Sequence, residues 1–442
     1  MVGIIMFFAA LVLLVVGYPV AFTFGAVALL FGGIAVFFEL ASDISIAAFC
    51  DEFVSMFSMM PFRIYSIMTN TILMAIPLFI LMGIILQKSR LAERLLESMG
   101  ILFGKVRGGL AISTVLVGAL LAASTGVVGA SVVAMGVISL PVMLKHGYSK
   151  RLSSGTICAS GTLGQLIPPS IVLIILGDVF QQPVGDLFRA ALMPGLVLVG
   201  AYILYIAIIS LLNKEVAPVI QVPEEEKKGM IARAVIAIVP PLALIVMVLG
   251  SIFMGVATPT ESASVGALGA MVLAACFKKL TKKVLLDASL ETVKITAMVF
   301  AILIGATAFS MVFVYTGADY IVEDFMMGLP GEKWGFLILS MICIMILGFF
   351  IDFIEISYIV VPILLPIANA IGLNPLWFAI LIATNLQTSF LSPPFGFSLF
   401  YLKGVSPPGV ETVDIYRGVI PFIIIQLMVL ASIVLIPGIY GL

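Results

Sequence analysis

Two stretches of the sequence decide the fold: GTLGQLIPPS at residues 161–170 and ATNLQTSFLSPPFGFSLF at residues 383–400. Both lie inside segments apolar enough to cross a membrane, yet each contains a double proline together with glycine and polar side chains. Proline lacks a backbone N–H and disfavours a helical residue before it, so each stretch should interrupt a helix. The sequence therefore predicts two membrane helices that are broken within the bilayer.

The two predicted breaks belong to an internal duplication. An offset of 225 residues (393 − 168) places Pro168 on Pro393, and the same offset places Pro141 on Pro366. Independent prolines that share one offset indicate that the two halves of the chain are copies of one unit. The hydrophilic linker at residues 213–229 divides the chain almost at its middle.

The composition is that of a membrane protein. The chain has 442 residues, of which 62% are hydrophobic and only 10% are charged, and its mean hydropathy is +1.28. Because a helix needs roughly 20 apolar residues to cross a bilayer, residues 190–212, 235–253 and 419–440 all qualify as spans. No basic cluster with interleaved aromatic residues occurs, so we expect membrane lipid and no nucleic acid around this chain.

The distribution of Lys and Arg predicts the orientation of the chain. If the spans alternate in direction, nearly all basic residues fall on one face, which is then the cytoplasmic one. The other face is acidic, and Trp334 and Trp377 begin apolar helices that leave it, as interfacial anchors do. Both chain ends are expected on the outer side. The first helix is expected to be retained, because it lacks the basic region and cleavage motif of a signal peptide.

A hairpin precedes each predicted break. Residues 108–147 contain two short apolar arms that meet at the small, polar tip AASTGVVGAS, and residues 334–372 have their tip near Asp352 and Glu355. The first hairpin should enter from the cytoplasm and the second from outside, so the two halves are inverted. Of the two carboxylates at the second tip, Glu355 is expected to face water.

The predicted fold is an all-α polytopic membrane fold of two inverted repeats. Each repeat has an interfacial arm helix, a re-entrant hairpin and a discontinuous helix, an arrangement that marks the substrate and ion sites of secondary transporters. The predicted parts are scaffold helices at 1–87, a cytoplasmic arm helix at 88–107, a first transport half at 108–189 (hairpin 108–147, broken helix 150–178), scaffold helices at 190–315 including the cytoplasmic linker, an external arm helix at 316–333, a second transport half at 334–403 (hairpin 334–372, broken helix 376–402) and a C-terminal helix at 404–442.

Five motifs, in this order and spacing, resemble the large membrane (DctM-type) subunit of tripartite ATP-independent periplasmic (TRAP) transporters. The resemblance covers essentially the whole chain, although a long external loop is expected at residues 39–61. The motifs are GYPVAFTFG at 17–25, AIPLFILMG at 75–83, GQLIPPS at 164–170, MGVATPTESASVGALGA at 254–270 and SPPFGFSLF at 392–400.

The resemblance implies a sodium-coupled symporter of elevator type, similar to the ion-transporter superfamily, in a bacterial or archaeal inner membrane. It further implies a small four-helix membrane subunit, expected as a separate polypeptide, and a soluble periplasmic binding protein that delivers an organic acid. A dicarboxylate, a 2-oxo acid, a hydroxy acid and a sialate all remain open as the substrate.

Polar residues at the tips and breaks are the candidate ligands, because irregular backbone at membrane depth is tolerated where it lines an enclosed or watered cavity. Asp352 stands out, since a carboxylate inside the membrane is costly and functional by default; a structural ion pair or a tip in external water is the alternative. Small residues also allow close helix packing. The predicted sets are Ser124, Thr125, Ser131, Gly161, Thr162 and Gly164 for a first Na⁺; Asp352, Gln387, Thr388 and Ser392 for a second Na⁺; and Ser124, Thr125, Gln165, Asn385, Thr388 and Ser389 for the substrate.

Other functions fit the sequence less well. The chain has no Walker loop, although a permease energised by a separate ATPase remains an alternative, as does a passive channel. His146 is the sole histidine and the cysteines are scattered, so no enzyme is expected. Glu261 follows a Thr-Pro-Thr turn, where Thr260 could cap a helix; capping is weighed equally against a role in substrate passage or docking.

Overall fold

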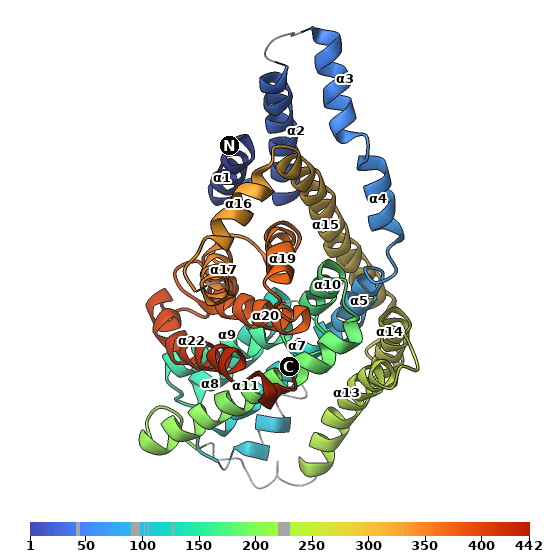
Figure 1. Ribbon diagram of the computed structural model, residues 1–442. Coiled ribbons are helices and arrows are strands. Elements are labelled where there is room, and N and C mark those ends of the chain that lie inside the picture. Colours follow the sequence, from blue (N-terminus) through green and yellow to red (C-terminus); the bar gives the residue numbers. More distant parts are fainter. Residues whose placement is uncertain are drawn as a thin grey trace. The chain divides into compact units, whose positions relative to one another are not determined.

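The structure confirms an all-helical architecture with several potential membrane spans. The computed structural model describes residues 1–40, 45–89, 98–100, 102–104, 106–125, 128–219, 230–331 and 333–442, and within these ranges the regular elements are all helices (Figure 1). Half of the predicted arm helix at 88–107 (residues 90–97, 101 and 105) and residues 220–229 of the linker lie outside the described residues. The described helices long and apolar enough to cross a membrane are α2 (Val20–Glu39), α8 (Val128–Lys145), α11 (Val184–Leu212), α13 (Met230–Phe253), α15 (Lys282–Tyr315), the segment Phe353–Ala370 and α22 (Thr412–Leu435).

The described helices form two compact units. Unit 1 comprises Met1–Leu73 and Lys294–Pro375, and unit 2 comprises Met74–Val293 and Leu376–Leu442. Besides α2 and most of α15, unit 1 contains α1 (Val2–Val16), α3 (Ile46–Phe57), α4 (Met60–Thr69), α16 (Ala318–Met327), α17 (Lys333–Leu347), α18 (Phe353–Glu355), the π-helix η2 (Ile356–Val360) and α19 (Val361–Ala370). Besides α8, α11, α13 and α22, unit 2 contains α5 (Ala75–Lys88), α7 (Gly109–Thr125), α9 (Lys150–Thr162), the 3₁₀-helix η1 (Leu163–Gln165), α10 (Ile171–Phe180), α14 (Pro259–Cys276), α20 (Pro375–Leu391), α21 (Phe397–Val405) and the 3₁₀-helix η3 (Pro437–Tyr440).

Each unit contains helices from both the predicted scaffold and the predicted transport halves. The helices α5, α13 and α14 group with the first hairpin in unit 2, and the second hairpin groups with α1 to α4 in unit 1. The units are defined by packing and not by motion, so the division into a static and a moving part stays a prediction.

The expected external loop at 39–61 is largely helical. Ser45 caps α3, with its Oγ accepting a hydrogen bond of 3.1 Å from the Ala48 N–H. The aromatic residues Phe49, Phe53 and Phe57 recur every fourth residue, so they share one helix face, and neighbouring rings lie 6.0 and 5.2 Å apart. This face packs on α2, where glycines 32 and 33 leave room for it. The expectation of a loop was wrong. It rested on the acidic residues of this stretch and overlooked the aromatic residues that recur with the period of a helix.

The first turn of α14 explains Glu261. The Thr258 Oγ1 accepts a 3.3 Å hydrogen bond from the Glu261 N–H, and the Glu261 Oε2 accepts 2.8 Å hydrogen bonds from the Thr258 N–H and hydroxyl. This is a capping box with Pro259 at the first helical position. The expectation that Thr260 caps the helix is wrong by two residues, because Pro259 takes the first helical position and Thr258 is the N-cap.

The capping box predicts a pH-dependent helix start. The hydrogen bonds from the Thr258 backbone and hydroxyl favour the carboxylate, so they lower the pKa of Glu261 below its ordinary value. The stabilisation of the helix start by the capping box should be fully present at a pH above the ordinary pKa of glutamate. It should be lost as the pH falls through the lowered pKa of Glu261. Hydrogen exchange in the first turn of α14, corrected for intrinsic rates, should accelerate in that acidic range in the wild type. Glu261→Ala should already exchange fast at pH 7, whereas Glu261→Gln, which keeps an acceptor, should lie between them; equal protection in all three proteins would contradict the box.

Candidate functional site

The first predicted break interrupts the helix between α9 and α10. The helix α9 ends at Thr162, continues as η1 to Gln165, and α10 begins at Ile171. Ser170 bridges the gap, because its Oγ donates a 2.6 Å hydrogen bond to the Gln165 carbonyl and accepts one of 3.5 Å from the Leu173 N–H. The peptide bond between Pro168 and Pro169 is cis. Because the first N–H groups of a helix point toward its N-terminus, those of α10 point back into the break.

The second break repeats this construction. The helix α20 ends at Leu391 and α21 begins at Phe397, with a cis bond between Pro393 and Pro394. Ser398, in the first turn of α21, donates a 2.8 Å hydrogen bond to the Phe390 carbonyl. The acceptor carbonyls of Gln165 and Phe390 are 225 residues apart (390 − 165), the same offset as the proline pairs. The internal duplication thus extends to the carbonyls that accept these hydrogen bonds, whereas the donor serines are 228 residues apart (398 − 170).

Both breaks lie in unit 2 and their helices are in contact. The Cys158 Sγ of α9 lies 3.6 Å from the Ser398 carbonyl, to which it donates. The first hairpin joins them, since α7 and α8 both pack on α9 and α8 also packs on α21. Gly161 faces the side chain of Val132, the neighbour of Ser131, so closely that no side chain fits there. Unit 2 therefore brings the return arm of the first hairpin to the first break, as the first predicted sodium set requires.

The hydroxyl groups near the breaks are oriented by their own helices. Thr162 donates to the Ala159 carbonyl at 2.9 Å, Thr388 to the Thr384 carbonyl at 3.0 Å, and Ser389 and Ser392 to the Leu386 and Thr388 carbonyls, both at 2.8 Å. All four residues are buried. Since each hydroxyl uses its hydrogen internally, its oxygen lone pairs are left to accept from a donor or to bind a cation.

The remaining polar residues of unit 2 are buried as well. Gln165, within the first break, is fully buried, and within the described part of the chain neither of its amide atoms has a hydrogen-bond partner. Asn385 and Gln387 are buried on α20, but two residues of helix separate them by about 200°, so they face nearly opposite directions. Ser131 is buried on α8. The backbone of Ser124 and Thr125 belongs to α7, whereas their side chains lie outside the described part.

Asp352 lies at the start of the second hairpin's return arm, in unit 1. It is the N-cap of α18, and its Oδ1 accepts a 2.7 Å hydrogen bond from the Phe353 N–H. The other predicted ligands of the second sodium set, Gln387, Thr388 and Ser392, belong to unit 2. Their grouping with Asp352 stays a prediction.

Glu355 is buried, contrary to the expectation that it faces water. It is 1% exposed, and its Oε2 has no hydrogen-bond partner among the described residues. The following segment Ile356–Val360 is a π-helix, a rare local form that occurs often at functional sites. The tip of the second hairpin thus holds two carboxylates with different surroundings, one capping a helix and the other buried.

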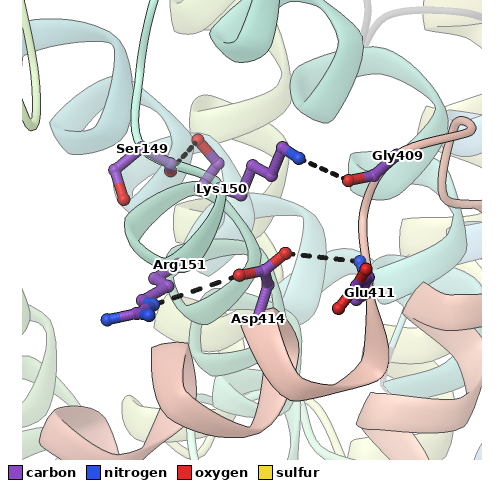
Figure 2. A network of polar contacts seen from close by, with 7 residues as sticks. Ser149, Lys150, Arg151, Gly409, Glu411 and Asp414 are labelled. Atoms are coloured by element: carbon purple, nitrogen blue, oxygen red, sulfur yellow. Dashed lines mark hydrogen bonds and ion pairs between the residues drawn. The ribbon is translucent and has the colours of Figure 1, made fainter.

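The start of α9 is tied to α22 (Figure 2). The Lys150 Nζ donates a 2.5 Å hydrogen bond to the Gly409 carbonyl, and the Arg151 Nε lies 4.0 Å from the Asp414 Oδ1. The Asp414 Oδ2 also accepts a 3.3 Å hydrogen bond from the Glu411 N–H. These contacts join a helix of the first half to the last long helix of the chain.

Comparison with known proteins gives consistent matches. The family model described as "Tripartite ATP-independent periplasmic transporter, DctM component" matches residues 7–439. The chain is 32% identical over 368 residues to the C4-dicarboxylate TRAP transporter large permease protein DctM of Pseudomonas aeruginosa, covering 83% of this chain and 84% of the relative. It is 31% identical over 369 residues to the isethionate TRAP transporter permease protein DctMQ of Oleidesulfovibrio alaskensis, covering 83% of this chain and 57% of that longer relative.

A solved structure shares the fold. The crystal structure of the Alcanivorax borkumensis YdaH transporter, reported to have an unusual topology, superposes with a TM-score of 0.61 and covers 88% of this chain and 90% of that one. The sequence identity is 13%, so the likeness is one of fold alone.

Proposed function

Because the chain belongs to the DctM component family of tripartite ATP-independent periplasmic transporters, we propose that it moves an organic acid anion across the inner membrane together with sodium ions, by an elevator movement. As a multi-pass transporter permease it is not an enzyme. The proposed moving part comprises the two predicted transport halves at 108–189 and 334–403. Relatives named for C4-dicarboxylate and for isethionate support an organic anion as the cargo.

One observation carries the proposal: two broken helices and a hairpin meet within unit 2. The Cys158–Ser398 contact sets the helices of the two breaks side by side, and the N-terminus of a half-helix follows each break. Half-helix N-termini present free N–H groups and a positive dipole end, which suit a carboxylate. The buried, unpartnered Gln165 amide, together with Ser389 and Asn385 on α20, is the proposed source of further substrate contacts, joined by Ser124, Thr125 and Thr388.

The proposed first sodium site lies between the first hairpin and the first break. Its ligands are oxygen atoms of Ser131, Gly161, Thr162 and Gly164, with Ser124 and Thr125 at the tip. Sodium is a hard cation that prefers oxygen ligands, and unwound backbone supplies carbonyls for it. The closeness of Gly161 to the hairpin and the inward-bonded Thr162 hydroxyl support this assignment.

A second sodium site is proposed at Asp352, whose carboxylate supplies the charge. Thr388 and Ser392, predicted from the sequence as its further ligands, have hydroxyl oxygens that retain free lone pairs. Gln387 is omitted from this proposal, because its amide lies beside Tyr202 and Gln426 on the other helices of unit 2. Ion binding would then add positive charge before the anion enters, which couples the two by differential affinity.

The proposed partners are a small membrane subunit and a periplasmic substrate-binding protein. The relative named DctMQ supports the first, because the match to this chain covers only 57% of that relative and its name adds the letter Q to DctM. The family description as tripartite supports the second.

The proposal predicts accumulation driven by sodium. In liposomes that contain this chain, the small subunit and the binding protein, a tenfold inward Na⁺ gradient supplies about 1.4 kcal/mol per ion. If each transport cycle moves two Na⁺ ions with one substrate and no net charge, the labelled organic acid should therefore be concentrated up to about a hundredfold. The same gradient of K⁺ and equal Na⁺ on both sides are the controls, and neither should give accumulation.

A passive channel is the second candidate, because polar breaks also line pores. It predicts that the labelled acid equilibrates to equal concentrations in Na⁺ and in K⁺ and never exceeds equality. That result in the liposome experiment would remove the sodium assignments together with the symport mechanism.

A further inference from the structure

Three buried polar side chains from three helices of unit 2 face one another. Tyr202 of α11, Gln387 of α20 and Gln426 of α22 are each fully buried, and both amides lie next to the Tyr202 hydroxyl. None of their five side-chain oxygen and nitrogen atoms has a hydrogen-bond partner of acceptable distance and angle within the described part of the chain. The three residues are called the Tyr202 cluster below.

This arrangement is costly unless something completes it. A buried polar group without a partner costs about 1–3 kcal/mol, and native proteins leave few such groups. The hydroxyls on the same stretch of α20 do not share the problem, since Thr384 and Thr388 bond to carbonyls one turn back. On this stretch of α20, only the Gln387 amide, which points to α11 and α22, has no hydrogen-bond partner among the described residues.

The aromatic packing fixes the Tyr202 cluster in place. The rings of Tyr202 and Tyr205 both meet Phe422 edge to face, at centroid distances of 5.1 and 5.2 Å. Phe422 lies one helical turn before Gln426 on α22. The Tyr202 hydroxyl therefore cannot swing away from the two amides without breaking this packing.

The hydrogen-bonding properties of the five atoms indicate which ligand the Tyr202 cluster can bind. The two amide nitrogens only donate hydrogen bonds, the two amide oxygens only accept them, and the tyrosine hydroxyl does both. A water molecule can accept from a nitrogen and donate to oxygens at once, as buried waters do with about three partners. A sodium ion would satisfy oxygens only and would lie against the amide hydrogens without a carboxylate from the cluster.

We propose that Tyr202, Gln387 and Gln426 form a buried site for an ordered water molecule that joins α11, α20 and α22. The water completes hydrogen bonds that the three adjacent side chains do not make to one another with acceptable distance and angle. It ties the helix before the second break to two helices without such a break, and it does not depend on the proposed sodium coupling.

Radiolytic hydroxyl-radical labelling of the purified full-length chain with its small subunit tests the site. A fully buried side chain is modified in this experiment only when a bound water adjoins it. Tyr202 should be labelled several-fold more than Phe188, which is equally buried on the same helix. After transfer into H₂¹⁸O, the heavy label should appear at Tyr202 more slowly than at exposed Tyr65, because the bound water exchanges slowly.

Variants and ions separate the alternatives. In a Gln387→Leu/Gln426→Leu protein of wild-type monodispersity, labelling of Tyr202 should fall to the level of Phe188. Labelling of Tyr202 no stronger than that of Phe188 in the wild type would overturn the proposal, and this reading needs no variant to fold. Loss of the Tyr202 label in Na⁺ but not in K⁺ would also overturn it, because a cation and not water would then occupy the cluster.

Discussion

Replacing Asp352 by asparagine should impair sodium-driven accumulation as strongly as replacing it by alanine. In the structure Asp352 caps α18 through its Oδ1, and asparagine is an equally good N-cap. Asp352→Asn therefore keeps the cap and removes only the charge, whereas Asp352→Ala removes both. If the carboxylate binds sodium, the two variants should lose transport alike.

The expected loss is large for electrostatic reasons. Two opposite unit charges in contact attract by several kcal/mol at an effective dielectric constant of about 20, and desolvation offsets part of this attraction. A remaining loss of at least about 1.4 kcal/mol raises the sodium concentration for half-maximal uptake at least about tenfold. The measurement is the initial uptake rate in liposomes as a function of Na⁺ concentration.

Two further outcomes define what Asp352 does. Near-normal sodium dependence in Asp352→Asn with impaired folding in Asp352→Ala would mean that the residue only caps α18. Asp324→Asn is the matched control, because it removes an exposed carboxylate from α16 in the same unit. It should leave the sodium dependence unchanged.

The breaks could be predicted from the sequence because their signals are local. A proline pair acts on the helix that contains it, so the ends of α9 and α20 follow from a few residues. The repeat offset, read first from prolines, also relates the carbonyls of Gln165 and Phe390 that close the breaks. The N-cap of α14 was harder to predict, because Thr258 and Thr260 can both cap a helix. The position of Pro259 as the first helical residue decides that Thr258 is the cap.

The partners of Gln387 could not be predicted, because they depend on helix rotation and on distant packing. Tyr202 and Gln426 come from helices far away in the sequence, and nothing local to α20 says which way its amide turns. A usable signal was nevertheless present: Gln426 is the one amide in the long apolar helix α22, and such a residue needs a partner. Ser398 was missed in the same way, although it lies only four residues after Pro394, in the first turn of α21.

A second large effect is expected where α9 crosses α22. Gly155 of α9 faces the carbonyl of Gly418, and Gly418 faces the carbonyl of Arg151, so that a Cβ on either glycine would overlap backbone atoms. A side chain could rotate away from such an overlap, but a helix backbone cannot. Alanine at 155 or 418 must therefore push the two helices apart, which also strains the Lys150–Gly409 and Arg151–Asp414 contacts (Figure 2).

Gly155→Ala and Gly418→Ala should each lower the free energy of unfolding by about 1–3 kcal/mol, the usual cost of overpacking. The exposed ion pair adds little to this, because such pairs contribute about 0–1 kcal/mol. Cys158, fully buried on α9, provides the readout: a thiol-reactive dye reports its exposure on heating, with Cys50, Cys276 and Cys343 replaced by serine. Gly200→Ala is the matched control, since Gly200 is also helical in unit 2 but has no atom near an added Cβ. If Gly155→Ala melts with the control, α9 and α22 do not pack through their glycines, and the crossing must be held by other residues.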